Sequence, residues 1–338
     1  MEGTTCYLSQ YANAIYVLNA DKANPSSVYI YDATAKSWSV QSIDTSSGFD
    51  PTNFATILDH DTNVFYAYSK GSIYALDMGL LKKANSTALA WIDVQSPDLD
   101  TTPNAAPDVA KVPGRNTQGY EPTLALARNH VHFLGVPGLK DGSDKIFIIH
   151  YSYMQPAPQS YSPAFPNTHG KTASFFLSST ISAPQKEYAF IPDDGSSTYV
   201  INAERNTTKV LAGPPSEDKL GVLSASMTAL VRVGSDGKVV WMAYDPSSSS
   251  SSSSWNTLDK LPSFLVATEQ TSTGKATRTP GTGTLKATGT GLGGVAASGS
   301  PVQDRTSGAL REGEGVKMIL GVGVALVWSV VATFGLGI

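Results

Sequence analysis

The stretch VYIYDATAKSWSV, residues 28–40, contains the pattern that decides the fold. An alternating run of β-branched and aromatic residues ends at an acidic residue, a polar turn follows, and a second run carries a tryptophan. Such short runs, bounded by turn-forming residues, predict β-strands joined by a hairpin. The same order returns in IYALDM…ALAWIDV (73–94) and VVWMAYDP…SWNTL (239–258). The recurrence predicts a repeated structural unit.

Groups of similar strand-like runs extend from Thr5 to about Leu265, and strong helical periodicity is absent. The third run of each group starts near residue 28, 73, 146, 198 or 240. A spacing of about 40–50 residues, with about four strands per unit, is typical of propeller blades. One wider spacing contains Gln95 to Gly119, which we expect to form a long surface loop or a lid.

The predicted fold is therefore an all-β propeller of four-stranded antiparallel blades, over residues 1–265. Five groups are visible, and they form either a five-bladed ring or part of one with six or seven blades. The opening residues 1–10 show neither the basic nor the apolar region of a secretory signal. We therefore expect a truncated start, which fits missing N-terminal blades. The alternative is an unrelated sandwich of antiparallel strands.

The three tryptophan-bearing stretches resemble the repeats of kelch and galactose-oxidase-type propellers, although the paired glycines of kelch repeats are absent. The resemblance implies that each tryptophan packs a blade against its neighbour. The family's copper-radical centre requires a cysteine joined to a tyrosine, a second tyrosine and two histidines. Cys6 is the only cysteine and lies in an ordinary strand-like run, so no copper site is carried over. The architecture also resembles uncharacterised fungal cell-surface propellers.

Composition narrows the function classes. The net charge of −4 and the pI of about 5.7 give no basic surface for nucleic acid. A single cysteine excludes a disulfide within the chain, and we expect Cys6 to be buried and inert.

Few residues suggest chemistry. His130, His132 and His150 lie on neighbouring predicted strands and could supply three metal-binding nitrogens. No carboxylate or cysteine completes a recognisable spacing, so we predict no metal site. The cluster Asp59-His60-Asp61 could bind a cation or transfer protons, but a polar hairpin turn is the favoured interpretation. We predict no catalytic residue and no cofactor.

The C-terminal part has a different character. Residues 266–309 are rich in Ser, Thr, Gly and Pro, which predicts a disordered, O-glycosylated stalk. Residues 310–338 combine a polar spacer with an uncharged apolar tail that begins at Met318. Small residues from Ser307, followed by this spacer and tail, predict a glycolipid (GPI) anchor attached at Ser307. The alternatives are a retained transmembrane helix and a buried core helix.

The tripeptides that begin at Asn85 and Asn206 are acceptor sequences for N-glycosylation in predicted turns. Together with the stalk and the tail, they predict a membrane-attached glycoprotein with an extracellular propeller. We expect a binding or adhesion protein with a glycan or protein ligand. The alternative is an extracellular carbohydrate-active enzyme built on the propeller.

Overall fold

The computed structural model describes residues 4–10, 12–99, 120–177, 183–247 and 253–258. The predicted stalk, the tail, Ser307 and nearly all of the insertion at 95–119 lie outside these residues. Within the described ranges, no helix has the length and apolar character needed to cross a membrane.

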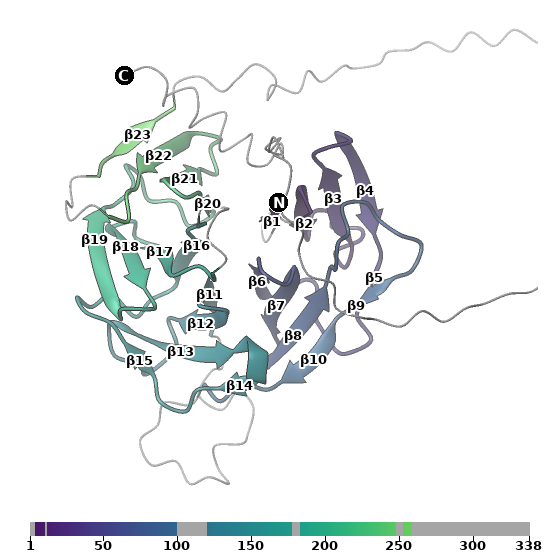
Figure 1. Cartoon of the computed structure of the whole chain (residues 1–338), viewed down its shortest axis with the longest axis horizontal. Coiled ribbons are helices and arrows are strands. Elements are labelled where there is room, and N and C mark those ends of the chain that lie inside the picture. Colours follow the sequence, from purple (N-terminus) through teal and green to yellow (C-terminus); the bar gives the residue numbers. More distant parts are fainter. Residues whose placement is uncertain (1–3, 11, 100–119, 178–182, 248–252, 259–338) are drawn as a thin grey trace, which may run out of the picture. The chain divides into compact units, whose positions relative to one another are not determined.

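The described strands form a five-bladed β-propeller (Figure 1). Blade 1 contains β1 (Thr5–Ser9), β2 (Ala14–Leu18), β3 (Val28–Asp32) and β4 (Ser37–Gln41). Blade 2 contains β6 (Ala55–Asp59), β7 (Val64–Ser69), β8 (Ser72–Asp77) and β10 (Ile92–Gln95). Blade 3 contains β11 (Thr123–Ala127), β12 (His130–Leu134), β13 (Ser143–Ile148), β14 (Tyr153–Met154) and β15 (Gln159–Ser160). Blade 4 contains β16 (Gly170–Ser174), β17 (Glu187–Pro192), β18 (Ser197–Asn202) and β19 (Thr207–Ala212). Blade 5 contains β20 (Val222–Ala225), β21 (Ala229–Val233), β22 (Val239–Ala243) and β23 (Trp255–Thr257).

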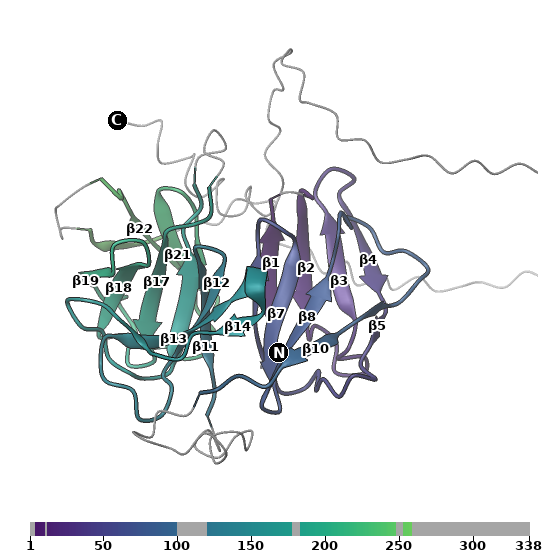
Figure 2. The same ribbon diagram turned by 60° about the horizontal axis from the view of Figure 1, so that its bottom comes forward.

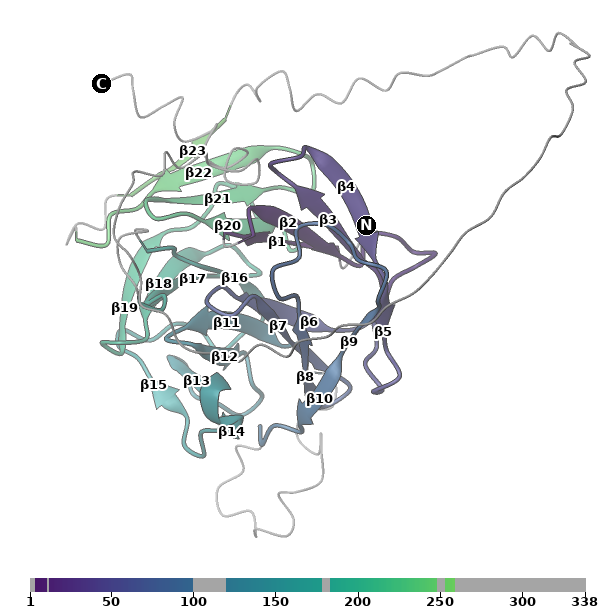
Figure 3. The same cartoon turned by 45° about the vertical axis from the view of Figure 1, so that its right-hand side comes forward.

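Each blade is an antiparallel sheet in chain order, as the side-by-side strands of blade 1 show in Figure 2. The first strands β6, β11, β16 and β20 line the inner side, where each contacts the next (Figures 1 and 3). In addition, β5 (Ile43–Asp44) and β9 (Leu89–Ala90) pair in parallel between blades 1 and 2. The 3₁₀ turn η1 (Ile149–Tyr151) follows β13.

The hairpin between the third and fourth strands explains the repeated acidic residue. In blade 1, Asp32 Oδ1 accepts hydrogen bonds from two following backbone N–H groups, at 2.8 and 3.0 Å. The turn then passes through Lys36 at a φ of 53°. Asn202 makes the same two bonds in blade 4, and Asn206 has a φ of 57°. Asp and Asn favour such turns because their short side chains bond to the backbone that follows.

Four hydrophobic clusters fill the seams between blades 1 and 2, 2 and 3, 3 and 4, and 4 and 5. In the first seam, Phe49 stacks on Trp91 with ring centroids 4.2 Å apart. The buried Asn63 adds polar links, because its side chain accepts from Ser9 at 2.8 Å and donates to the Tyr16 hydroxyl at 2.9 Å. Apolar burial therefore joins the blades, with hydrogen bonds that satisfy the polar groups enclosed in the seam.

One row of side chains recurs in every blade, with one residue from each strand or from its immediate border; we call it the seam row. In blades 2 to 5 it lies in the seam with the preceding blade. Its members are Leu58, Phe65, Leu76 and Trp91 in blade 2; Leu126, Val131, Phe147 and Met154 in blade 3; Ser174, Tyr188, Ile201 and Thr208 in blade 4; and Ala225, Leu230, Met242 and Trp255 in blade 5. All of them are buried except Trp255, which is half-buried.

The predicted all-β propeller is confirmed, and the third strands begin at residues 28, 72, 143, 197 and 239. The strand β20 was not predicted as a separate strand, because Val222–Ala225 is short and follows a Pro- and Asp-rich connection. The division of the outer edge of blade 3 between β14 and β15 was not predicted either.

Candidate functional site

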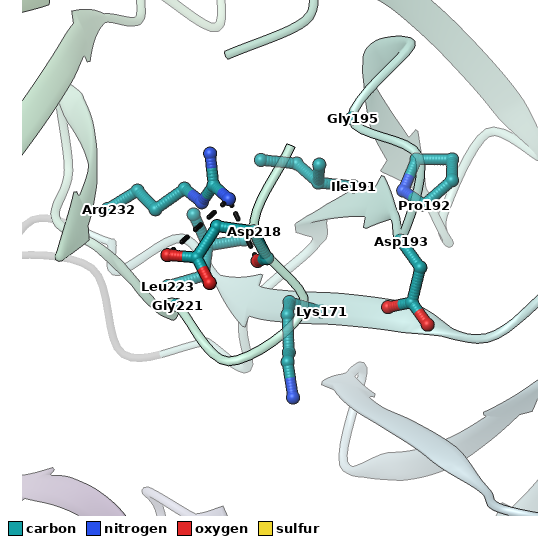
Figure 4. A pocket seen from close by; sticks show the side chains of 9 residues that line it. All are labelled: Lys171, Ile191, Pro192, Asp193, Gly195, Asp218, Gly221, Leu223 and Arg232. Atoms are coloured by element: carbon teal, nitrogen blue, oxygen red, sulfur yellow. Dashed lines mark hydrogen bonds and ion pairs between the residues drawn. The ribbon is translucent and has the colours of Figure 1, made fainter. Parts of the chain in front are cut away.

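A small, shallow pocket lies between blades 4 and 5, and its space is about 290 Å³ when the open solvent at its mouth is counted (Figure 4). Lys171 enters it from β16, Asp193 from the turn after β17, and Arg232 from β21. Asp218 comes from the connection between the two blades. Two cationic and two anionic side chains therefore border one hollow.

Arg232 and Asp218 form one fixed wall of the pocket. The buried Arg232 guanidinium donates to the backbone oxygens of Ser216 at 2.6 Å and Asp218 at 2.8 Å. The Asp218 carboxylate accepts from the N–H groups of Ser235 and Leu220 at 2.6 and 3.0 Å. Burial alone would raise the pKa of Asp218, but these backbone donors hold it below its ordinary value. Both charges thus serve to fix the connection between the blades.

Lys171 and Asp193 form the open side of the pocket. Figure 4 shows both side chains directed away from Arg232. Asp193 Oδ2 lies 2.9 Å from His169 Nδ1, whereas its Oδ1 is buried without a hydrogen-bond partner. The Lys171 ammonium forms no ion pair within the described part of the chain. A ligand at this mouth would meet the Lys171 ammonium and the Asp193 side chain, which is 24% exposed.

The predicted histidines lie elsewhere, and the ring centroids of His130 and His132 are 6.5 Å apart. His60 packs against Phe176 with ring centroids 4.7 Å apart, and burial lowers its pKa to about 4. Burial also lowers the pKa of His130 to about 4, and His150 contacts Asn129 at 3.2 Å. Among the residues that the structure describes, no three His, Cys, Asp or Glu side chains gather as a metal site.

Burial also raises the pKa of Asp61, with the neighbouring Asp59 charge adding to the effect. Asp59 itself is fully buried, and its carboxylate accepts from the Thr62 hydroxyl at 2.6 Å and from the Asp61 N–H at 3.3 Å. The cluster at 59–61 therefore has the hydrogen bonds of the polar turn that the sequence favoured.

His132 instead belongs to a closed network in the seam between blades 3 and 4. Its Nδ1 lies 2.7 Å from Asp144 Oδ2, to which the Tyr188 hydroxyl donates at 3.1 Å. The Tyr161 hydroxyl lies 3.3 Å from the same ring nitrogen. Burial and the Asp144 charge raise the pKa of Tyr188 well above its ordinary value. His132 and Asp144 are 1% and 0% exposed, so the network joins the blades and is closed to a ligand.

The seam row of blade 1 is uncovered, unlike its four counterparts. It contains Leu8, Ile15, Tyr31 and Trp38, paired in register across the sheet. The first three are only half-buried, and Trp38 is 60% exposed. The tryptophan packing implied by the resemblance therefore holds for the buried Trp91 but not for Trp38. Cys6 lies on the same face and is exposed, so the expectation that it is buried was wrong.

Both predicted glycosylation acceptors are exposed. Asn85 lies between β8 and β9, where its side chain accepts from the Thr87 N–H at 2.9 Å. Asn206 occupies the hairpin between β18 and β19. Glycosylation at either position stays a prediction, as does lipid attachment at Ser307.

Two comparisons with known proteins gave no relative. No protein-family model matches the chain, and no curated protein matches it. The chemistry of the site therefore carries the functional argument.

Proposed function

We propose that this chain is a cell-surface binding protein whose propeller holds a glycan at the pocket between blades 4 and 5. The propeller fold itself is consistent with a binding scaffold. We further propose that it is related to the kelch and galactose-oxidase-type propellers. Asn85 and Asn206 would carry N-glycans, and the C-terminal tail would attach the protein to the membrane.

The observation that carries the proposal is that Lys171, which has no ion pair within the described residues, and Asp193, whose Oδ1 has no hydrogen-bond partner, border the same pocket. Sugar hydroxyls both donate and accept hydrogen bonds, so neighbouring hydroxyls could bond to the Asp193 carboxylate and the Lys171 ammonium at once. Such charge-assisted bonds are stronger than neutral ones. The unsatisfied Asp193 Oδ1 supports this assignment, because a buried acceptor without a partner is costly unless a ligand or a water bonds to it.

The position of the pocket supports the same proposal. Because each blade is an up-and-down sheet, the turn after the second strand and the connection to the next blade emerge at one end. That end carries Asp193 and Asp218, and the connection at residues 96–122 begins and ends there too. Binding residues are concentrated on loops held by a rigid scaffold.

A glycan array with the full chain would identify ligands, and variants would then test the site. We expect Asp193→Asn to weaken binding of the best glycan about 10- to 150-fold, as loss of a charge-assisted bond of about 1.5–3 kcal/mol implies. Lys171→Met should weaken it similarly. Asp194→Asn is the matched control, because Asp194 is exposed in the same turn and its partner in the described structure is Ser196. Equal affinity of all three variants would contradict the proposed site.

Attachment is tested on intact cells with a phosphatidylinositol-specific phospholipase. Release of the propeller, lost on Ser307→Pro, would support the anchor. Retention of the propeller, with the tail detectable in the mature protein, would assign a transmembrane helix instead.

A further inference from the structure

We propose that the uncovered face of blade 1 pairs two copies of this chain. The face consists of two rows that cross all four strands. One is the seam row, and the other lies beside it. The second row contains Cys6, Val17, Tyr29 and Val40.

The residues of this face are of the apolar and aromatic types that are buried between blades elsewhere in the propeller. In blades 2 to 5 the seam row is covered by the preceding blade and is buried, apart from the half-buried Trp255. In blade 1, Trp38 is 60% exposed, whereas its counterpart Trp91 in blade 2 is 3% exposed. No hydrophobic cluster within the described residues joins blade 1 to blade 5. Of the eight side chains of the face, three are exposed, four are half-buried and Val17 is buried. Apolar surface left open in this way marks an interaction site.

Charge favours a second copy as the partner. The eight side chains of the face include no Asp, Glu, Lys or Arg, and the one carboxylate of the described residues that is hydrogen-bonded to them is that of Asp21, which accepts from the Tyr29 hydroxyl at 3.2 Å. Apart from this carboxylate, a two-fold contact between identical faces brings no like charges together. Exposed Tyr and Trp side chains are those that most often dominate the affinity of protein interfaces. The aromatic pair of Tyr31 and Trp38, with ring centroids 5.0 Å apart, would lie within the contact.

The size of the face indicates a weak dimer. Four strands spaced about 4.8 Å apart, each about 17 Å long, give a footprint of roughly 320 Å² per copy. The accessible surface is larger than this flat footprint, because side chains project from the sheet. Two copies would therefore bury a total accessible surface on the order of 1,000 Å², near the lower limit of specific interfaces. We therefore expect association that depends on protein concentration. Because each copy has a net charge of −4, added salt should strengthen it.

Two substitutions at equivalent positions test the interface. Val40 and Val210 both lie in the fourth strand of their blade and are 46% and 42% exposed. We expect Val40→Asp to abolish association of the full chain in sedimentation experiments with a mild detergent. Val210→Asp should leave it unchanged. Circular dichroism would verify that both variants are folded.

The single cysteine provides a second readout. In intact cells that express two tagged copies of the full chain, a bismaleimide should crosslink them through Cys6, and Val40→Asp should remove the product. A monomer at every concentration, without crosslinking, would overturn the proposal. Protection of Cys6 from maleimide in the monomer would also overturn it, because another part of the chain would then cover the face. None of these results depends on the glycan pocket.

Discussion

Leu8 and Leu58 occupy the same place in the seam rows of blades 1 and 2, which makes them a matched pair. Leu58 is fully buried against blade 1, whereas Leu8 is only half-buried on the open face. Replacing a fully buried leucine by alanine removes its transfer free energy and leaves a cavity, at a cost of about 2–5 kcal/mol. At Leu8 no enclosed cavity forms, and we expect a loss below about 1.5 kcal/mol, half or less of full burial.

Urea unfolding of the full chain, followed by circular dichroism at low protein concentration, measures both losses. Working at low concentration keeps the proposed dimer dissociated, so that the stability of one copy is compared. We expect the midpoint to fall clearly for Leu58→Ala and little for Leu8→Ala, with unchanged slopes. Equal losses would refute the reasoning, because they would mean that Leu8 is enclosed within the monomer as fully as Leu58.

Burial lowers the pKa of His60 and of His130 to about 4, so between pH 6.5 and 4 the unfolded chain binds protons there that the folded chain does not. The free energy of unfolding should therefore decrease as the pH is lowered through that window. An NMR titration of His60 with a midpoint near pH 6.5 would contradict this. Asp144→Asn changes the buried acceptor that His132 and Tyr188 share, and calorimetry should detect a loss of about 1–3 kcal/mol, as for other disrupted buried hydrogen bonds. Arg232→Met removes two hydrogen bonds to the connection at 213–221, so amide exchange there should accelerate while exchange in β17 stays unchanged.

The sequence was sufficient for the fold because the same local signal recurs. The side chains of turn residues such as Asp32 and Asn202 accept hydrogen bonds from the backbone N–H groups that follow them. The turn can therefore be predicted without knowledge of tertiary contacts. Four short strands per 40–50 residues then allow few architectures. The short strand β20 escaped detection because its residues carry little local preference and are held by pairing with β21.

The candidate site could not be predicted in this way. Lys171 and Asp193 are 22 positions apart in the sequence, and no motif links them. They meet at one mouth because β16 and β17 pair antiparallel, which brings the start of one strand beside the end of the other. The exposure of Trp38 was equally hidden, since its own stretch matches those of the buried Trp91 and the half-buried Trp255. Only the neighbours in space distinguish the three.

Because no hydrophobic cluster joins blade 1 to blade 5 in the described structure, the five blades behave thermodynamically as a linear array of units with two ends. In such an array each unit is stabilised by its own folding and by the interfaces with its nearest neighbours. Blades 2, 3 and 4 each share two filled seams, whereas blades 1 and 5 share one each in the described structure. Opening should therefore begin at the two terminal blades and move inward, so that the amides of blade 3 exchange last. Pairing of two copies through blade 1 would join two arrays into one of ten blades, leaving blade 5 of each copy as the fraying end.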